Sequence, residues 1–351
     1  MMRRVLIVKF GAIGDVVMAL PAVRVLHQEG NEIDWVCGRG VAPLLACYPW
    51  VRTIVVDDRA LLTGRKFAKA KALVSLWRRV VGRRYTLCAT LYYDRRYRWL
   101  TLPVRAECKV MLSARDRALR LLPSRHHTDE YARVLLGLED GCRPEGLAPV
   151  RPDQLPESPL DSKRAAVRVA LVPAGASNML KQQTLRRWPA ERYAALARMM
   201  LERGWEVVLL GGPDDIWVRP HFEGMGVVDL IGELTLPEVI SACDGCDAVV
   251  SHDTGPLHLA ALSRAAVIAL FGPTDPGNFM PRRPGVVGIW GGEGFACRPC
   301  YDGRDFADCD NNGCMQQITV GMVMSQLDGL LSRLGSPARL VLPSAAIGDP
   351  R

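Results

Sequence analysis

The sequence lacks any uninterrupted run of about 20 apolar residues, the length that a membrane-spanning helix requires. Lys9, Asp15, Arg264 and Pro273 interrupt its most apolar segments. It also lacks low-complexity segments, and its 49% hydrophobic and 23% charged residues are ordinary for a soluble protein. These absences exclude collagen-like, coiled-coil and disordered chains. They predict a folded protein that does not cross a bilayer.

The first residues, MMRRVLIVKFGAIGDVVMALPA, lack the unbroken apolar core of a secretory signal, because Lys9 and Asp15 interrupt it. We therefore expect a cytoplasmic protein. Because the cytosol keeps thiols reduced, the eleven cysteines are expected to be free thiols or metal ligands rather than a disulfide framework.

The length of 351 residues predicts two domains. Short β-branched runs alternate with helical patterns along the whole chain, which is typical of parallel sheets with crossover helices. The fold class is therefore α/β, with two Rossmann-like, doubly wound sheets facing a central cleft. Strands are expected at 5–10, 32–38, 52–57, 85–93 and 108–112, and then at 167–173, 205–212, 226–232, 247–253, 265–272 and 286–290.

A proline-rich stretch at 141–165 has little apolar periodicity and is typical of an interdomain linker. We place the boundary at residue 156. The division is then 1–156 for the first domain, 157–335 for the second, which the helix at 320–334 closes, and 336–351 for a loosely held tail. Ligands of open parallel sheets collect at the carboxyl ends of strands, so the loops that follow strands are where function is expected.

Positive charge is concentrated in one part of the chain. The net charge is +8, but residues 59–125 alone hold 18 Lys and Arg against three acids. Such concentration favours an anionic partner at that face, either nucleic acid or an acidic glycolipid at a membrane surface. None of the usual base-reading modules is present, so we do not expect nucleic acid. The alternative is a set of solvated helices whose basic side chains only cover apolar surface.

The loop after the first expected strand joins Lys9 to Asp15 and contains Gly11 and Gly14. The two glycines allow the backbone to approach a ligand closely. The loop does not match the G-x-G-x-x-G fingerprint, which disfavours a nicotinamide dehydrogenase. Asp15 has two interpretations, a functional carboxylate or a residue that only stabilises the start of a helix.

A second loop, Ser251–His258, follows the strand DAVVS and opens another helix. Pro256 suits the first helical position, which places Gly255 at the cap and leaves the next backbone N–H groups free to hold a phosphate. His258 then lies one turn inside the helix, facing such a ligand or packed in the core.

KFGAIGDVVMALPAVRVL and SHDTGPLHLAALSRAAVIALFGPTDP resemble the glycosyltransferase family 9 heptosyltransferases of lipopolysaccharide core synthesis. PAGASN, RRWPAERYAAL and LIGELTLPEVISACD extend the resemblance through the second half. The resemblance implies a GT-B fold and an inverting transfer from an ADP-heptose donor, bound mainly by the second domain. The acceptor, bound mainly by the first, is expected to be an anionic lipopolysaccharide core. The basic region would meet its carboxylates and phosphates, with peripheral contact at the inner membrane.

The resemblance also assigns roles to residues. Asp15 matches the general base, on an acceptor-side loop with Lys9, Gly11 and Gly14. The family has a basic pair before Trp-Pro whose first member is usually Lys, so either Lys181 or Arg186 could meet the diphosphate. No cofactor is expected for catalysis, because cations and N–H groups can stabilise the leaving diphosphate. The implied donor-binding residues are Lys181, Arg186, Arg187, Glu233, Asp253, Thr254, Gly255, Pro256 and His258.

Four cysteines, Cys297, Cys300, Cys309 and Cys314, fall within eighteen residues. They could enclose a structural zinc or iron, or they could be an ordinary thiol-rich loop. Similar clusters occur in the family branch that heptosylates autotransporter proteins, which makes an acceptor protein the first rival to the glycolipid. The second rival is a non-catalytic nucleotide- or nucleic-acid-binding protein, favoured only by charge.

Overall fold

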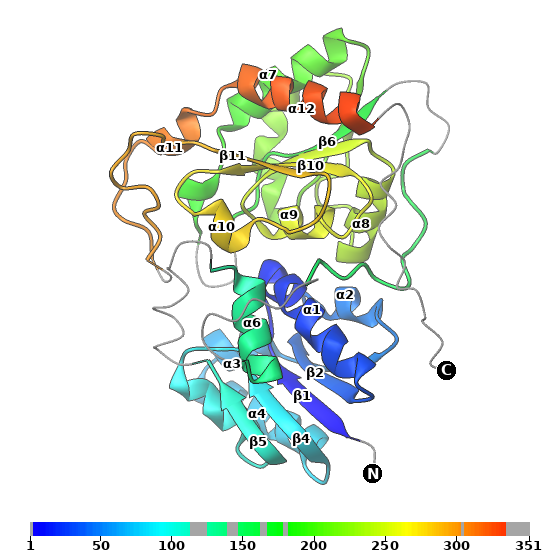
Figure 1. Cartoon of the computed structure of the whole chain (residues 1–351), viewed down its shortest axis with the longest axis vertical. Coiled ribbons are helices and arrows are strands. Elements are labelled where there is room, and N and C mark those ends of the chain that lie inside the picture. The colour runs from blue at the N-terminus through cyan, green and yellow to red at the C-terminus, as the bar shows by residue number, and fades with distance from the viewer. Residues whose placement is uncertain are drawn as a thin grey trace.

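The computed structural model describes residues 3–112, 125–138, 147–161, 167–177, 182–302 and 305–334. They form two parallel β-sheets, one from each half of the chain, with helices packed on both faces (Figure 1). In Figure 1 the first half, blue to green, lies below the second half, green to red. Within the described ranges, none of the helices combines the length and the apolarity that a bilayer crossing requires.

The first sheet has five strands in the order β3-β2-β1-β4-β5, and every pairing in it is parallel. Alternate residues of β1 serve opposite faces, since Val5 and Ile7 enter one apolar cluster and Leu6 and Val8 another. The strands are β1 (Arg4–Val8), β2 (Glu32–Gly38), β3 (Val51–Val56), β4 (Arg84–Thr90) and β5 (Arg105–Met111).

Helices cover both faces of this sheet. α1 packs on the face that turns toward the second half, whereas α4 covers the opposite face with Leu76 and Val80. The described helices of this half are α1 (Ile13–Gln28), α2 (Ala42–Ala46), α3 (Asp58–Thr63), α4 (Lys66–Val80), the 3₁₀ helix η1 (Arg95–Thr101) and α6 (His127–Leu136).

The second sheet has six strands in the order β11-β10-β9-β6-β7-β8, again all parallel. β9 and β10 are buried along their whole length, as the continuous apolar runs in their sequences predict. The strands are β6 (Arg168–Val172), β7 (Glu206–Leu209), β8 (Val228–Asp229), β9 (Ala248–His252), β10 (Ala266–Phe271) and β11 (Val286–Trp290).

On the outer face of the second sheet, α7 and α12 pack over an apolar cluster that includes Trp188 and Leu327. α8 and α9 cover the inner face. The described helices of this half are η2 (Thr184–Arg186), α7 (Ala190–Glu202), η3 (Pro213–Phe222), α8 (Leu236–Asp244), α9 (Gly255–Ala260), α10 (Pro276–Phe279), α11 (Gly313–Gln316) and α12 (Val320–Leu334).

The two halves meet through helices. One apolar cluster runs without a break from Val17 of α1 and Tyr131 of α6 to Ile240 of α8 and Leu257 of α9. The start of α1 lies against the start of α9, where a Cβ added to Gly255 would come within 3.2 Å of Ile13. Because these helices follow β1 and β9 directly, the carboxyl ends of the two central strands face each other across this seam.

The expected strands are all present, and each of their ends lies within three residues of the expected one. The helix predicted at 320–334 is confirmed. The boundary at 156 lies between the last strand of the first sheet and the first strand of the second, and it stays a prediction. The predicted tail at 336–351 lies outside the described residues.

Candidate functional site

Asp15 lies in the first turn of α1, and two side chains fix its carboxylate. The Tyr131 hydroxyl donates a hydrogen bond to Asp15 Oδ1 at 2.6 Å. Lys9 Nζ lies 3.1 Å from Asp15 Oδ2. The Asp15 side chain is 27% exposed, whereas the Lys9 side chain is 6% exposed. The carboxylate is therefore oriented by its neighbours and still open to a reactant.

Lys9 is itself held in place. Its ammonium donates to the Leu91 carbonyl at 3.2 Å and lies over the Tyr92 ring, 4.5 Å from its centroid. A buried cation needs such partners, and the Asp15 carboxylate supplies a negative charge 3.1 Å away. The Lys9 ammonium thus stabilises negative charge on Asp15 by Coulomb attraction in a partly desolvated site.

The loop after β9 is held by partners from the segments that follow β6 and β10. Asp253 is 2% exposed and accepts hydrogen bonds from Arg186 Nη1 at 3.3 Å and from Thr274 Oγ1 at 2.8 Å. Thr254 Oγ1 accepts from the Ala176 backbone N–H at 2.8 Å. The expected cap is wrong by one residue, because Thr254 is the N-cap and Gly255 begins α9. Pro256 follows in the first turn, where its missing N–H costs no hydrogen bond.

Arg186 and Arg187 have different surroundings. Arg186 donates a hydrogen bond through Nη1 to Asp253, while its Nε is buried and has no hydrogen-bond partner within the described residues. Arg187 donates through Nε to the Gly175 carbonyl at 2.8 Å and lies over the Trp217 ring. Burial lowers the pKa of Arg187, and Asp215 opposes that shift. Arg186 is therefore the better placed to offer a donor to an anion.

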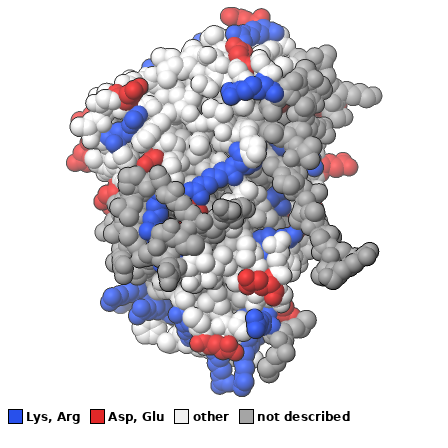
Figure 2. Space-filling view, viewed as in Figure 1, with Lys and Arg blue, Asp and Glu red and all other residues white. Residues whose placement is uncertain are grey.

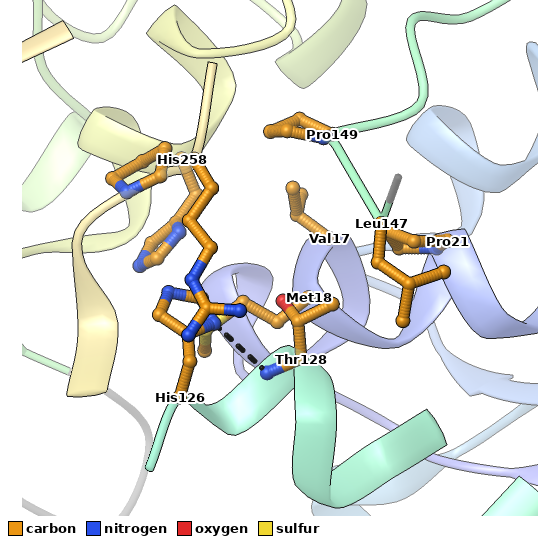
Figure 3. A pocket seen from close by; sticks show the side chains of 10 residues that line it. Val17, Met18, Pro21, His126, Thr128, Leu147, Pro149 and His258 are labelled. Carbon is orange, nitrogen blue, oxygen red and sulfur yellow. Dashed lines mark hydrogen bonds between the residues drawn. The ribbon is translucent and has the colours of Figure 1, made fainter. Parts of the chain in front are cut away.

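His258 lies at the seam between the two loops. It is 5% exposed, and burial lowers its pKa, while Asp253 and Asp15 both act in the opposite direction. Burial thus favours the neutral imidazole, whereas the two carboxylates favour its protonated form. Figure 3 shows His258 facing a small pocket together with His126 and Thr128 at the start of α6 and Met18 of α1. The pocket has room for about one water molecule.

The structure gives Gly14 a role that its sequence position did not suggest. A Cβ on Gly14 would lie 2.6 Å from Cδ2 of the His258 ring, whereas a Cβ on Gly11 would meet only Val41, at 4.0 Å. We predicted both glycines to allow close approach of a ligand. Gly14 permits the close approach of α9 to α1, and its place on the acceptor-side loop stays a prediction.

Sequence reasoning missed the start of α6, which binds the second half directly. His126 bonds through Nε2 to the Met280 carbonyl at 2.9 Å, and Nη1 of Arg282 reaches both carboxylate oxygens of Asp129 at 2.8 and 2.9 Å. The same helix carries Tyr131. The signal was HHTDEY, a polar run directly before an apolar helical pattern, which we did not single out.

Three groups of predicted residues are not brought into this site by recorded contacts. Glu233 is exposed in a turn after β8 and uses its backbone N–H to bond the Leu230 carbonyl. Lys181 lies outside the described residues. The cysteines gather in one loop region, since Cys300 and Cys309 both contribute to a raised pKa at Cys314.

The four cysteines do not form the predicted coordination sphere as they are placed. The described residues contain no group of three or more His, Cys, Asp or Glu side chains positioned to hold a metal. All ten cysteines within the described ranges are free thiols. Burial is the main cause of the raised pKa at both Cys300 and Cys314, and it opposes the thiolate form that binds a metal.

Comparisons with known proteins agree with this geometry. A family model described as glycosyltransferase family 9 (heptosyltransferase) matches residues 159–309. Lipopolysaccharide heptosyltransferase 1 of Pseudomonas aeruginosa is 30% identical over 316 residues, which cover 85% of this chain and 86% of that protein.

Solved structures share the fold. The structure of E. coli ADP-heptose lps heptosyltransferase II superposes with a TM-score of 0.68 at 20% identity, covering 95% of this chain and 99% of that one. The iron-containing dodecameric glycosyltransferase TibC from enterotoxigenic E. coli gives 0.60 at 16% identity, covering 95% of this chain and 77% of that one. These likenesses confirm the expected GT-B arrangement of two Rossmann-like sheets.

Proposed function

The chain belongs to glycosyltransferase family 9, the heptosyltransferases, and from this premise we propose that it moves a heptose from ADP-heptose to an anionic lipopolysaccharide core acceptor with inversion. One observation carries the proposal. The first turn of α1, which carries Asp15 at the end of β1, packs against the start of α9, which follows the Asp253 loop at the end of β9. A Cβ on Gly14 would lie 2.6 Å from the His258 ring there. A reaction between a ligand of each half would take place at this seam.

Asp15 is the proposed general base. Its carboxylate must accept a proton from the acceptor hydroxyl as that oxygen attacks the anomeric carbon. Tyr131 and Lys9 hold the carboxylate in one orientation, and its residual exposure leaves room for a hydroxyl. Inversion requires this single base on the face opposite to the leaving ADP, which is why the base and the donor loop come from different halves.

The donor diphosphate is proposed to lie against the loop after β9, with Arg186 as its main cation. The unpartnered Nε of Arg186 supports this, because a buried donor without an acceptor is costly unless a ligand supplies one. Gly255 lets the start of α9 pack closely against Ile13 of α1, and Thr254 positions the loop through its bond from the Ala176 N–H. Arg187, His258 and Glu233 are proposed to line the same donor site, and no residue here requires a metal.

Two experiments test these assignments. Asp15→Asn keeps the shape of the side chain but cannot accept the proton, so turnover should fall by about 10² to 10⁴ while ADP affinity changes little. Tyr131→Phe, which removes only the orienting hydrogen bond, should cost less. Undiminished turnover in Asp15→Asn would exclude the base. ADP binding, measured by calorimetry, should persist in the presence of a chelator.

An acceptor protein is the second candidate. The four-cysteine segment and the fold shared with the iron-containing TibC favour it. In that case a structural metal would have to draw Cys297, Cys300, Cys309 and Cys314 closer together than they lie here. A panel of core glycolipids and acceptor proteins, with mass-spectrometric detection of the product, separates the two.

Family membership disfavours the non-catalytic alternative. The glycolipid proposal includes a cytoplasmic location beside the inner membrane.

A further inference from the structure

α4 carries two apolar stripes, although a helix on the surface of a sheet needs one. The first stripe, with Leu76 and Val80, packs into the core of the first sheet. The second begins at Phe67 and continues in steps of three or four residues through Ala70, Val74, Trp77 and Val81, so these residues share another face. Phe67 is 83% exposed, Val81 55% and Val74 41%.

η1 extends this second stripe. The Trp77 indole N–H donates to the Trp99 carbonyl at 2.9 Å, which fixes η1 beside that face of α4. Trp99 is 60% exposed and Leu102, directly after η1, is 58% exposed. We call the set Phe67, Val74, Val81, Trp99 and Leu102 the α4–η1 surface. Large apolar side chains rarely gather on a protein exterior unless something covers them.

The rim of the α4–η1 surface is basic. Lys66, Lys69, Lys71 and Arg78 are exposed on α4, and Arg98 precedes Trp99. Figure 2 shows Lys and Arg gathered at the lower left of the molecule, where Figure 1 places α3 and α4. The single acid within η1 and its N-cap, Asp94, is paired with Arg96. An apolar stripe with a positively charged rim is the pattern of a helix that lies in a membrane interface.

The structure assigns the α4–η1 surface to an anionic lipid bilayer, into which Phe67, Trp99 and Leu102 insert while the lysines meet lipid phosphates. Two copies of this face would bring like charges together, and a nucleic acid would leave Val74, Val81 and Leu102 uncovered. α4 runs antiparallel to the strands, so its first turn, with Phe67, lies at the end of the sheet where Asp15 lies. The bilayer would thus hold the acceptor side of the seam. The inference rests on the membrane-side location in the proposed function and names the surface that makes the contact; it does not depend on which sugar or acceptor is used.

The test is co-sedimentation with vesicles of equal parts phosphatidylcholine and phosphatidylglycerol, and with phosphatidylcholine alone, both without any acceptor. Wild type should bind the anionic vesicles and not the neutral ones. Phe67→Ser/Trp99→Ser should weaken binding at least about tenfold, through lost apolar burial. Lys66→Gln/Lys69→Gln/Lys71→Gln should weaken it about 100-fold, at roughly fivefold per lysine near an anionic surface.

The matched control is Ile216→Ser/Met322→Ser, which removes similarly exposed apolar side chains from the second half and should bind as wild type. A second measurement changes only Trp99 in the stripe. Vesicles with brominated acyl chains should quench the tryptophan fluorescence of the wild type more than that of Trp99→Phe. If Phe67→Ser/Trp99→Ser bound the vesicles as tightly as the wild type, or if quenching were equal in wild type and Trp99→Phe, the inference would be overturned. Binding would then be electrostatic adsorption alone.

Failure here is distinguishable from failure of the proposed function. On a water-soluble acceptor, Phe67→Ser/Trp99→Ser should turn over as wild type, because neither residue lies in the seam. Inactivity of the wild type on every acceptor, with vesicle binding intact, would count against the transferase proposal alone. Dimerisation of wild type that Phe67→Ser abolishes would assign the face to a second copy and overturn the lipid assignment.

Discussion

The contact between Gly14 and His258 offers a sharp test of how the two halves meet. Gly14→Ala adds one methyl group in the first turn of α1. That Cβ would lie 2.6 Å from Cδ2 and 2.9 Å from Nε2 of the His258 ring, well inside van der Waals contact. The ring is buried, and the adjoining pocket has room for only about one water molecule, so it can yield little.

The expected magnitude follows from two opposing effects. Replacing a helical glycine by alanine ordinarily stabilises a protein by up to about 1 kcal/mol. Forcing an extra methyl into a packed contact costs about 1–3 kcal/mol. Gly14→Ala should therefore be less stable than Gly329→Ala by about 1–3 kcal/mol. At Gly329, in α12, the added Cβ would meet nothing closer than Arg333 Nη2, at 3.8 Å.

The assay is urea unfolding of Gly14→Ala, His258→Ala and the double variant. His258→Ala alone leaves a cavity, and Gly14→Ala alone makes a clash, so each should destabilise. Together they should offset each other, giving a coupling energy of at least about 1 kcal/mol. Additive effects, or a Gly14→Ala variant as stable as Gly329→Ala, would show that α1 and α9 do not pack as described.

Three further predictions concern two buried histidines, Arg186 and the four-cysteine segment. Burial lowers the pKa of His126 and of His252 to about 3, so the folded protein keeps both neutral. In the unfolded chain both histidines are protonated below about pH 6.5. As the pH is lowered below that value, the free energy of unfolding should therefore decrease, by up to about 1.4 kcal/mol per pH unit for each histidine. A free energy of unfolding that stays constant between about pH 7 and 5 in urea melts would contradict this. His126→Asn, which can still cap α6, should reduce the dependence of that free energy on pH. Arg186→Gln should weaken ADP binding by about 10- to 100-fold in calorimetry, whereas exposed Arg264→Gln should leave it unchanged. If the four cysteines take up a structural metal, protein purified without metal-affinity columns should carry close to one equivalent of zinc or iron, and Cys300→Ser should release it and lower the melting temperature; well under one equivalent would leave an ordinary thiol-rich loop.

The α/β class and the positions of the strands along the chain were predictable from the sequence, because buried parallel strands such as β9 and β10 are short, continuous apolar runs. Local signals also placed the loops after β1 and β9 at strand ends, where ligands of such sheets collect. The Asp253–Gly255 loop and Arg186 could be assigned to one donor site from their resemblance to a family, and the structure does bring Arg186 to Asp253.

What the sequence could not supply were contacts between residues distant along the chain. Tyr131 lies 116 positions from the Asp15 that it orients, and no periodicity links the two. The cap at Thr254 was misplaced by one residue, because Ala176, on another strand end, is what fixes its hydroxyl. The role of Gly14 depends on an imidazole in the opposite half, which only the packing of α1 on α9 brings within reach. Hydrophobic patterns determine which face of each element is buried, but the tertiary structure alone decides which partner it is buried against.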